Sequence, residues 1–151
     1  MSLAKVALQD LAHADKHTSE LKTWEITAPT GYEPYAAAVL LHHVYGAIEA
    51  TIERSLKIFD GASPDGVDSH VQLLEQASRA VEGVRGVILP HDDAVDELRR
   101  FRHRFRKRYD VDIEPALLQP VIKAAVTSWP RIRAHLDGFA AFVEECAKVA
   151  K

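Results

Sequence analysis

Apolar residues recur at three- and four-residue spacing along nearly the whole chain, and strict alternation of apolar and polar residues is hard to find. This spacing predicts an all-α fold, an antiparallel bundle of about four to six amphipathic helices with short connections. The expected helices cover about residues 3–25, 34–59, 63–81 and 92–109, followed by one long helix or two nearly collinear helices from about residue 115. Pro120 and Pro130 predict a kink or a break in this last part.

Two helix starts carry local signals. Ser63 followed by Pro64 has the pattern of an N-cap and a first helical residue, and predicts that the third helix begins there. Asp92 or Asp93 can cap the fourth helix, which carries the apolar residues Ala94, Leu98, Phe101 and Phe105.

Length and composition narrow the class of protein. The 151 residues are 47% hydrophobic and 27% charged, which predicts a single globular domain over residues 1–151. No apolar run approaches the roughly 18 residues that cross a bilayer, and the first residues show no signal-peptide core, so we expect a cytoplasmic protein. Cys146 is the single cysteine, which excludes an internal disulfide and a cysteine-based zinc site. We expect no metal and no cofactor.

The distribution of charge changes this picture. The net charge is only −3, but residues 99–108 hold seven of the 19 lysines and arginines and none of the 22 acidic residues. The seven cations are Arg99, Arg100, Arg102, Arg104, Arg106, Lys107 and Arg108. Cations at a helix end can simply favour the helix dipole, but seven in ten positions exceed what capping requires. The segment therefore predicts a surface that binds anions or RNA.

Helical geometry separates these cations. Leu98, Phe101, Phe105 and Tyr109 lie within roughly 40° of one direction around the expected helix, which makes them its core face. Arg102 lies at the border of this face, so we expect its stem to pack and its guanidinium to be held in one place. His103 and Lys107 share the opposite face. Arg102 and Lys107 are about 140° apart on an ideal helix, so one phosphate can meet both only if the helix unwinds or if two chains build the site.

The same segment resembles a known family. Arg102, four residues, Lys107, one residue and Tyr109 are similar to the Arg, four residues, His, one residue, Tyr signature of the HepT-like toxins of the HEPN superfamily, with lysine in the place of histidine. The resemblance extends over about residues 35–145. It includes the segments 40–49, 58–61, 70–75 and 96–103 in the same order and spacing.

The resemblance implies an α-helical, dimeric, metal-independent RNA endonuclease that acts on tRNA or mRNA. It also implies a toxin–antitoxin pair in which the partner is a minimal nucleotidyltransferase that adds AMP to the motif tyrosine. Tyr109 is the matching acceptor. Arg102, Lys107 and His103 are the implied or alternative catalytic residues, and the RNA would be bound by Arg99, Arg100, Arg104, Arg106 and Arg108.

The departure at Lys107 leaves alternatives open. Cleavage through the ribose 2′-hydroxyl needs proton transfer, for which histidine is suited, whereas a lysine near its reference pKa of about 10.4 is a poor base. Either neighbouring cations lower the pKa of Lys107, or His103 supplies an imidazole, or the chain binds RNA, a nucleotide or the nucleotidyltransferase without cleaving. A purely structural interaction protein is a third class.

The other histidines predict less. His13 and His17 are four apart on the first helix, which is a metal-binding spacing, but an exposed polar face is the better interpretation without a clear third ligand. His42 and His43 are adjacent and face different directions. We expect one of them to be a core or dimer-seam histidine.

Overall fold

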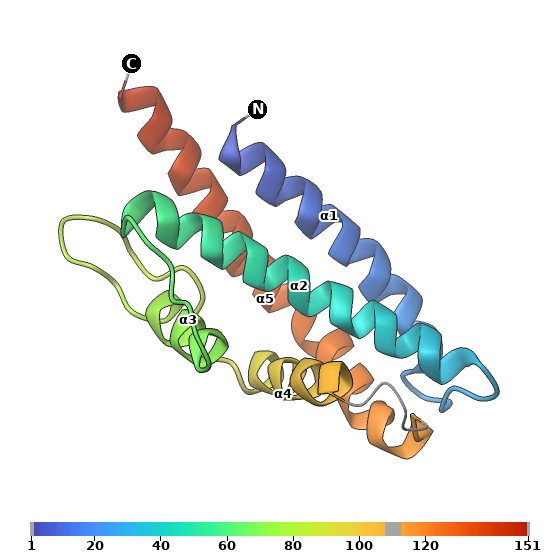
Figure 1. The fold of residues 1–151 in the computed structure, drawn as a ribbon. Coiled ribbons are helices and arrows are strands. Elements are labelled where there is room, and N and C mark those ends of the chain that lie inside the picture. The colour runs from blue at the N-terminus through green and yellow to red at the C-terminus, as the bar shows by residue number, and fades with distance from the viewer. Residues whose placement is uncertain (1, 108–112, 151) are drawn as a thin grey trace. The chain divides into compact units, whose positions relative to one another are not determined.

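The computed structural model describes residues 2–107 and 113–150. The structure is 75% helical, and the described residues contain no strand, only an isolated bridge between Val81 and Arg85. Figure 1 shows the elements in chain order, which are α1 (Leu3–Leu21), the 3-10 helix η1 (Lys22–Trp24), α2 (Glu33–Phe59), α3 (Ser69–Ala77), α4 (Asp93–Lys107) and α5 (Pro115–Val149). The predicted all-α fold is confirmed.

Most of the predicted helices form where the apolar spacing placed them. Gly61, with φ of 80°, follows the end of α2 at a backbone angle that a helix cannot continue. α5 is one continuous helix that contains both Pro120 and Pro130, so the predicted break is absent. The prediction of a single long helix is the one that holds.

The predicted start of the third helix is wrong. α3 begins at Ser69 rather than at Ser63-Pro64. Gly66 has φ of 92°, which lies outside the helical region, and Val67 is 98% exposed. The helix also ends before Val81. The backbone carbonyl of Val81 instead accepts a hydrogen bond from the backbone N–H of Arg85 in a tight turn. The cap and proline pattern was present, but the glycine two residues later overrides it.

The chain forms two compact units, each of which draws on several helices. Unit 1 comprises residues 1–12, 47–91 and 131–151, and unit 2 comprises residues 13–46 and 92–130. That the whole chain is one domain stays a prediction.

Unit 1 holds a ring cluster and a buried arginine. Phe59 of α2 contacts Phe139 and Phe142 of α5, with ring centroids 5.6 and 5.7 Å apart. Arg85 is 5% exposed, and its guanidinium donates to both carboxylate oxygens of Asp60 at 2.7 and 2.8 Å. The same guanidinium also donates to the carbonyls of Arg79, Gly86 and Gln76. These bonds fix the long connection after α3.

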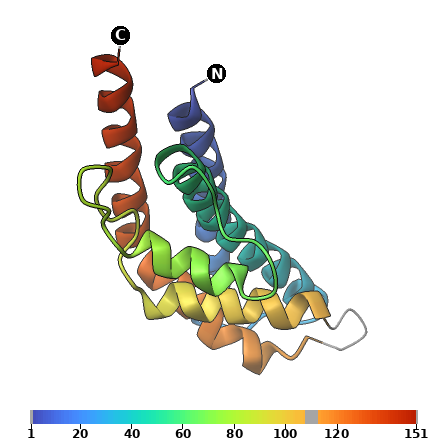
Figure 2. The same ribbon diagram turned by 60° about the vertical axis from the view of Figure 1, so that its left-hand side comes forward.

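Unit 2 holds the end of α1, the first half of α2, α4 and the first part of α5. Figures 1 and 2 both show α4 alongside the first part of α5. Trp129 of α5 donates its indole N–H to Asp15 of α1 at 2.7 Å. Gln119 donates to the carbonyls of Trp24 and Glu25 at 2.6 Å, which satisfies backbone groups at the end of η1.

Candidate nucleic-acid interface

The basic helix α4 begins at an acidic cap. The Asp92 carboxylate accepts a hydrogen bond from the backbone N–H of Ala94 at 2.9 Å, as the sequence predicts for a capping aspartate. Asp93 and Asp96 lie in the first turn, where negative charge favours the helix dipole. The acidic start and the cationic end therefore both stabilise this helix.

One face of α4 is apolar and anchors it. Leu98 is 1% exposed and Phe101 is 8% exposed, and the half-buried Phe105 ring lies 5.9 Å from the Phe101 ring in a stacked arrangement. These residues were predicted as the core face. Burial of this face fixes the rotation of the helix, and so decides which cations face solvent.

Of the residues predicted to contact RNA, three are exposed to solvent and a fourth lies near an acidic side chain. Arg100, Arg104 and Arg106 are exposed, as is His103. Arg99 is half-buried and its Nε lies 3.6 Å from the Asp96 carboxylate one turn earlier, so part of its charge is offset. The exposed arginines project from different sides of α4, and the segment 98–107 that carries them has no acidic residue.

Arg102 differs from its neighbours. It is half-buried, its Nε is covered, and its Cζ lies 5.8 Å from the centroid of the Tyr45 ring. Tyr45 belongs to α2 and is fully buried. A guanidinium over an aromatic ring gains cation–π attraction and loses rotational freedom. Arg102 therefore sits where the sequence predicted, at the border of the core face.

Lys107 is the last residue of α4, so the backbone is helical up to this position. The unwinding that could bring Lys107 toward Arg102 does not occur within α4. The Lys107 side chain lies outside the described part of the structure, as do Arg108 and Tyr109.

A row of histidines was missed by sequence reasoning. The rings of His17 in α1 and His43 in α2 lie 5.3 Å apart, His43 and His42 lie 6.2 Å apart, and His42 lies 6.2 Å from Phe105 in α4. Burial lowers the pKa of His17, and the nearby His43 lowers it further. The signal that could have found this row is the occurrence of histidines on two predicted helices, but their contact needs tertiary structure.

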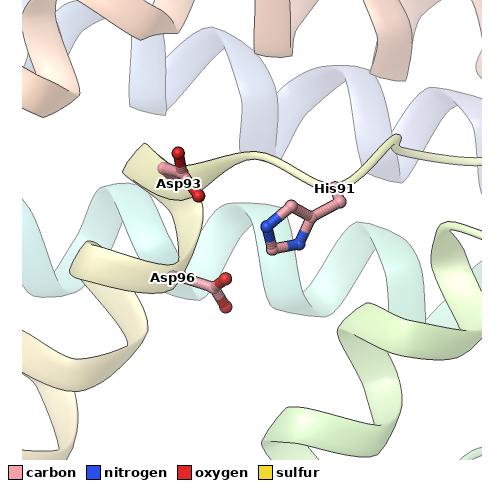
Figure 3. Close-up of side chains that lie close together, drawn as sticks. All are labelled: His91, Asp93 and Asp96. Atoms are coloured by element: carbon pink, nitrogen blue, oxygen red, sulfur yellow. The ribbon is translucent and has the colours of Figure 1, made fainter.

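Three potential metal ligands lie close together along the chain at the start of α4 (Figure 3). The ligand atoms of His91, Asp93 and Asp96 lie within 4.8 Å of one another. Two of these residues are exposed, and Asp96 pairs with Arg99. Because acidic residues at a helix start already favour the dipole, we assign this group no metal function.

Unit 2 has a surface hollow whose lining residues include none of the α4 cations that the structure describes. Its lining comes from the end of α1, from η1 and from the start of α2, and comprises Glu20, Thr23, Trp24, Tyr35, Ala36, Val39 and Leu40.

The structure is that of an all-α protein. Its cationic helix α4 carries Arg102, which is half-buried over the Tyr45 ring. Comparison with protein families supplies the particular family: the HepT-like protein family matches residues 36–143. The chain belongs to this family, within the HEPN superfamily, and membership indicates a domain of the toxin–antitoxin type. Comparisons with curated proteins and with solved structures gave no match. Within the described residues, no helix has the length and apolarity to span a bilayer.

Proposed function

We propose that this chain is the toxin of a toxin–antitoxin pair, which binds RNA on α4 and cleaves it without a metal ion. The observation that carries the proposal is Arg102, a guanidinium packed over the buried Tyr45 on the helix that also carries the exposed Arg100, Arg104 and Arg106. A preorganised guanidinium can stabilise the extra negative charge of a phosphorane, and the exposed cations can hold the flanking phosphates.

The proposed site is shared by two copies of the chain. Because α4 is helical through Lys107, Arg102 and Lys107 stay about 140° apart around the helix, so one copy cannot present both to one phosphate. A twofold pair can bring Arg102 of one copy to the cations of the other. We further propose that a minimal nucleotidyltransferase is the antitoxin and that Tyr109 accepts AMP from it.

The second candidate function is RNA binding without cleavage. The observation that favours it is Lys107 itself, since a protonated lysine holds a phosphate but removes no proton from a hydroxyl at neutral pH. Under this alternative the α4 face acts as a binding surface for RNA or for the nucleotidyltransferase.

The test is incubation of the purified chain with total tRNA in EDTA. We expect cleavage by the unmodified chain and a loss of at least about 100-fold in Arg102→Ala, because removal of one transition-state donor typically costs this much. Arg79→Ala is the matched control, since Arg79 is an exposed arginine outside α4.

The result separates the two functions. RNA that is bound by the unmodified chain but cleaved only by Lys107→His would support the non-catalytic alternative. Absence of RNA binding at low salt by the unmodified chain would contradict both.

A further inference from the structure

His17 and His43 bring two imidazole rings together from separate helices of unit 2. Figures 1 and 2 both show the end of α1 alongside the first half of α2. The two ring centroids lie 5.3 Å apart, and the ring planes are tilted by 48°. Two imidazoles that share one metal ion, at bond lengths of about 2.1 Å and a tetrahedral angle, have centroids roughly 5–5.5 Å apart. The observed separation lies within this range.

The covered nitrogen of His17 is an independent indication of a ligand. Nδ1 of His17 is buried from solvent and has no hydrogen-bond partner among the residues that the structure describes. A buried polar atom without a partner costs free energy, so such atoms are uncommon in folded proteins. A metal ion coordinated by the His17 ring would give this nitrogen a partner. Burial lowers the pKa of His17 and the nearby His43 lowers it further, so the metal-free ring is neutral at about pH 7.5, which is the form that binds metal.

His13 extends this pair to three imidazoles. It lies one turn before His17 on α1, and histidines four positions apart on a helix can bind one metal ion together. The sequence alone offers no clear third ligand for His13 and His17, but the fold supplies one by packing His43 of α2 against His17. His13 and His43 are exposed, so both side chains can turn toward an ion that enters from solvent.

We infer that His13, His17 and His43 form a binding site for a divalent transition-metal ion that links α1 to α2. Imidazole nitrogens favour ions such as Zn²⁺ over Mg²⁺, which prefers oxygen ligands. Three protein ligands leave the fourth position of a tetrahedral site to water. The ion stabilises the packing of α1 on α2, because it binds the folded arrangement of the three rings. The site makes no use of α4, so the inference is independent of the RNA cleavage proposed above.

The experiment is titration of the full chain, without an affinity tag, with zinc chloride at about pH 7.5, followed by calorimetry and by thermal unfolding. We expect one Zn²⁺ bound per chain, a melting temperature that rises with the Zn²⁺ concentration, and no comparable response to magnesium chloride. His13→Gln, His17→Gln and His43→Gln should each weaken binding by at least about tenfold, since loss of a residue that merely hydrogen-bonds to a ligand already costs about 10- to 100-fold. His135→Gln, which removes an exposed histidine of α5, should bind Zn²⁺ as the unmodified chain does.

Three other outcomes would overturn the assignment. The first is absence of Zn²⁺ binding by the unmodified chain, and the second is unchanged affinity in any one of the three variants. The third is loss of binding in His91→Gln with His43→Gln unaffected, which would place the ion at the start of α4 instead. Because His43 is exposed, His43→Gln should keep the metal-free melting temperature of the unmodified chain, so the test holds even where His17→Gln does not fold.

Discussion

Arg85 and Arg102, two of the buried or half-buried arginines of this chain, have opposite surroundings. Arg85 of unit 1 is 5% exposed and its guanidinium is occupied by both oxygens of Asp60 and by three backbone carbonyls. Arg102 of unit 2 is half-buried over the Tyr45 ring, on a helix of exposed cations. The first arrangement uses the guanidinium within the protein, and the second holds it beside a charged surface. The same side chain is therefore a structural element in one region and a candidate phosphate ligand in the other.

The largest expected effect is on the stability contributed by Arg85. Arg85→Ala leaves the Asp60 carboxylate and three carbonyls without their donor, and should lower the free energy of unfolding by about 3–5 kcal/mol. Urea denaturation measures this change. Arg79→Ala, which removes an exposed side chain on the same connection, should stay within about 0.5 kcal/mol. A decrease in the free energy of unfolding below about 1 kcal/mol in Arg85→Ala would show that Arg85 is not an important structural residue.

Arg102→Ala should show the reverse pattern. We expect the rate of RNA cleavage to fall by at least about 100-fold, whereas the free energy of unfolding falls by no more than about 1–2 kcal/mol, which is the scale of one cation–π contact. Parallel urea denaturation and cleavage assays give both values. A protein that unfolds as readily as Arg85→Ala would show that Arg102 is structural as well.

The exposed arginines of α4 should control the salt dependence of RNA binding. The triple variant Arg100→Gln, Arg104→Gln and Arg106→Gln should reduce the slope of log K against log salt by about 2, at roughly 0.7 for each phosphate contact with a single strand. Filter binding over a salt series measures the slope. Lys5→Gln, Lys57→Gln and Arg79→Gln remove the same charge from unit 1 and should leave the slope nearly unchanged.

The smallest expected effect is a dependence of stability on pH through His17. Burial and then His43 lower the pKa of His17 below 6.5, with His13 and Lys16 acting in the same direction and Glu20 opposing them. The unfolded chain therefore binds the proton at higher pH than the folded chain, so this contribution is complete above about pH 6.5 and is lost as the pH falls below it. Urea denaturation at about pH 7.5 and about pH 5.5 should show a smaller drop in His17→Gln than in the unmodified chain. An equal drop in both proteins would exclude His17 as its source.

The sequence predicts the parts of the fold that local spacing controls. The apolar face of α4 and the border position of Arg102 follow from helical geometry, and the start of α4 follows from Asp92. The start of α3 was placed wrongly because a backbone angle at Gly66 overrides a local cap pattern.

The contacts of His42 and Tyr45 with α4 and the Arg85 bonds could not be predicted, because each joins residues from separate elements. Sequence spacing places His42 and Tyr45 on one face of α2 and Arg102 and Phe105 on one face of α4, but gives no indication that these faces meet. The partners of Arg85 include Asp60, which lies 25 positions earlier in the chain.

The central claim is that the held guanidinium of Arg102 assists metal-free RNA cleavage, and Arg102→Lys tests it most directly. Lysine keeps the positive charge but lacks the planar fork that binds two phosphoryl oxygens. In EDTA, the unmodified chain should convert a defined oligoribonucleotide to a fragment ending in a 2′,3′-cyclic phosphate. Arg102→Lys should bind the same RNA within about threefold but cleave it at least about tenfold more slowly. Equal cleavage by the two proteins, or RNA bound and left intact by the unmodified chain, would contradict the claim.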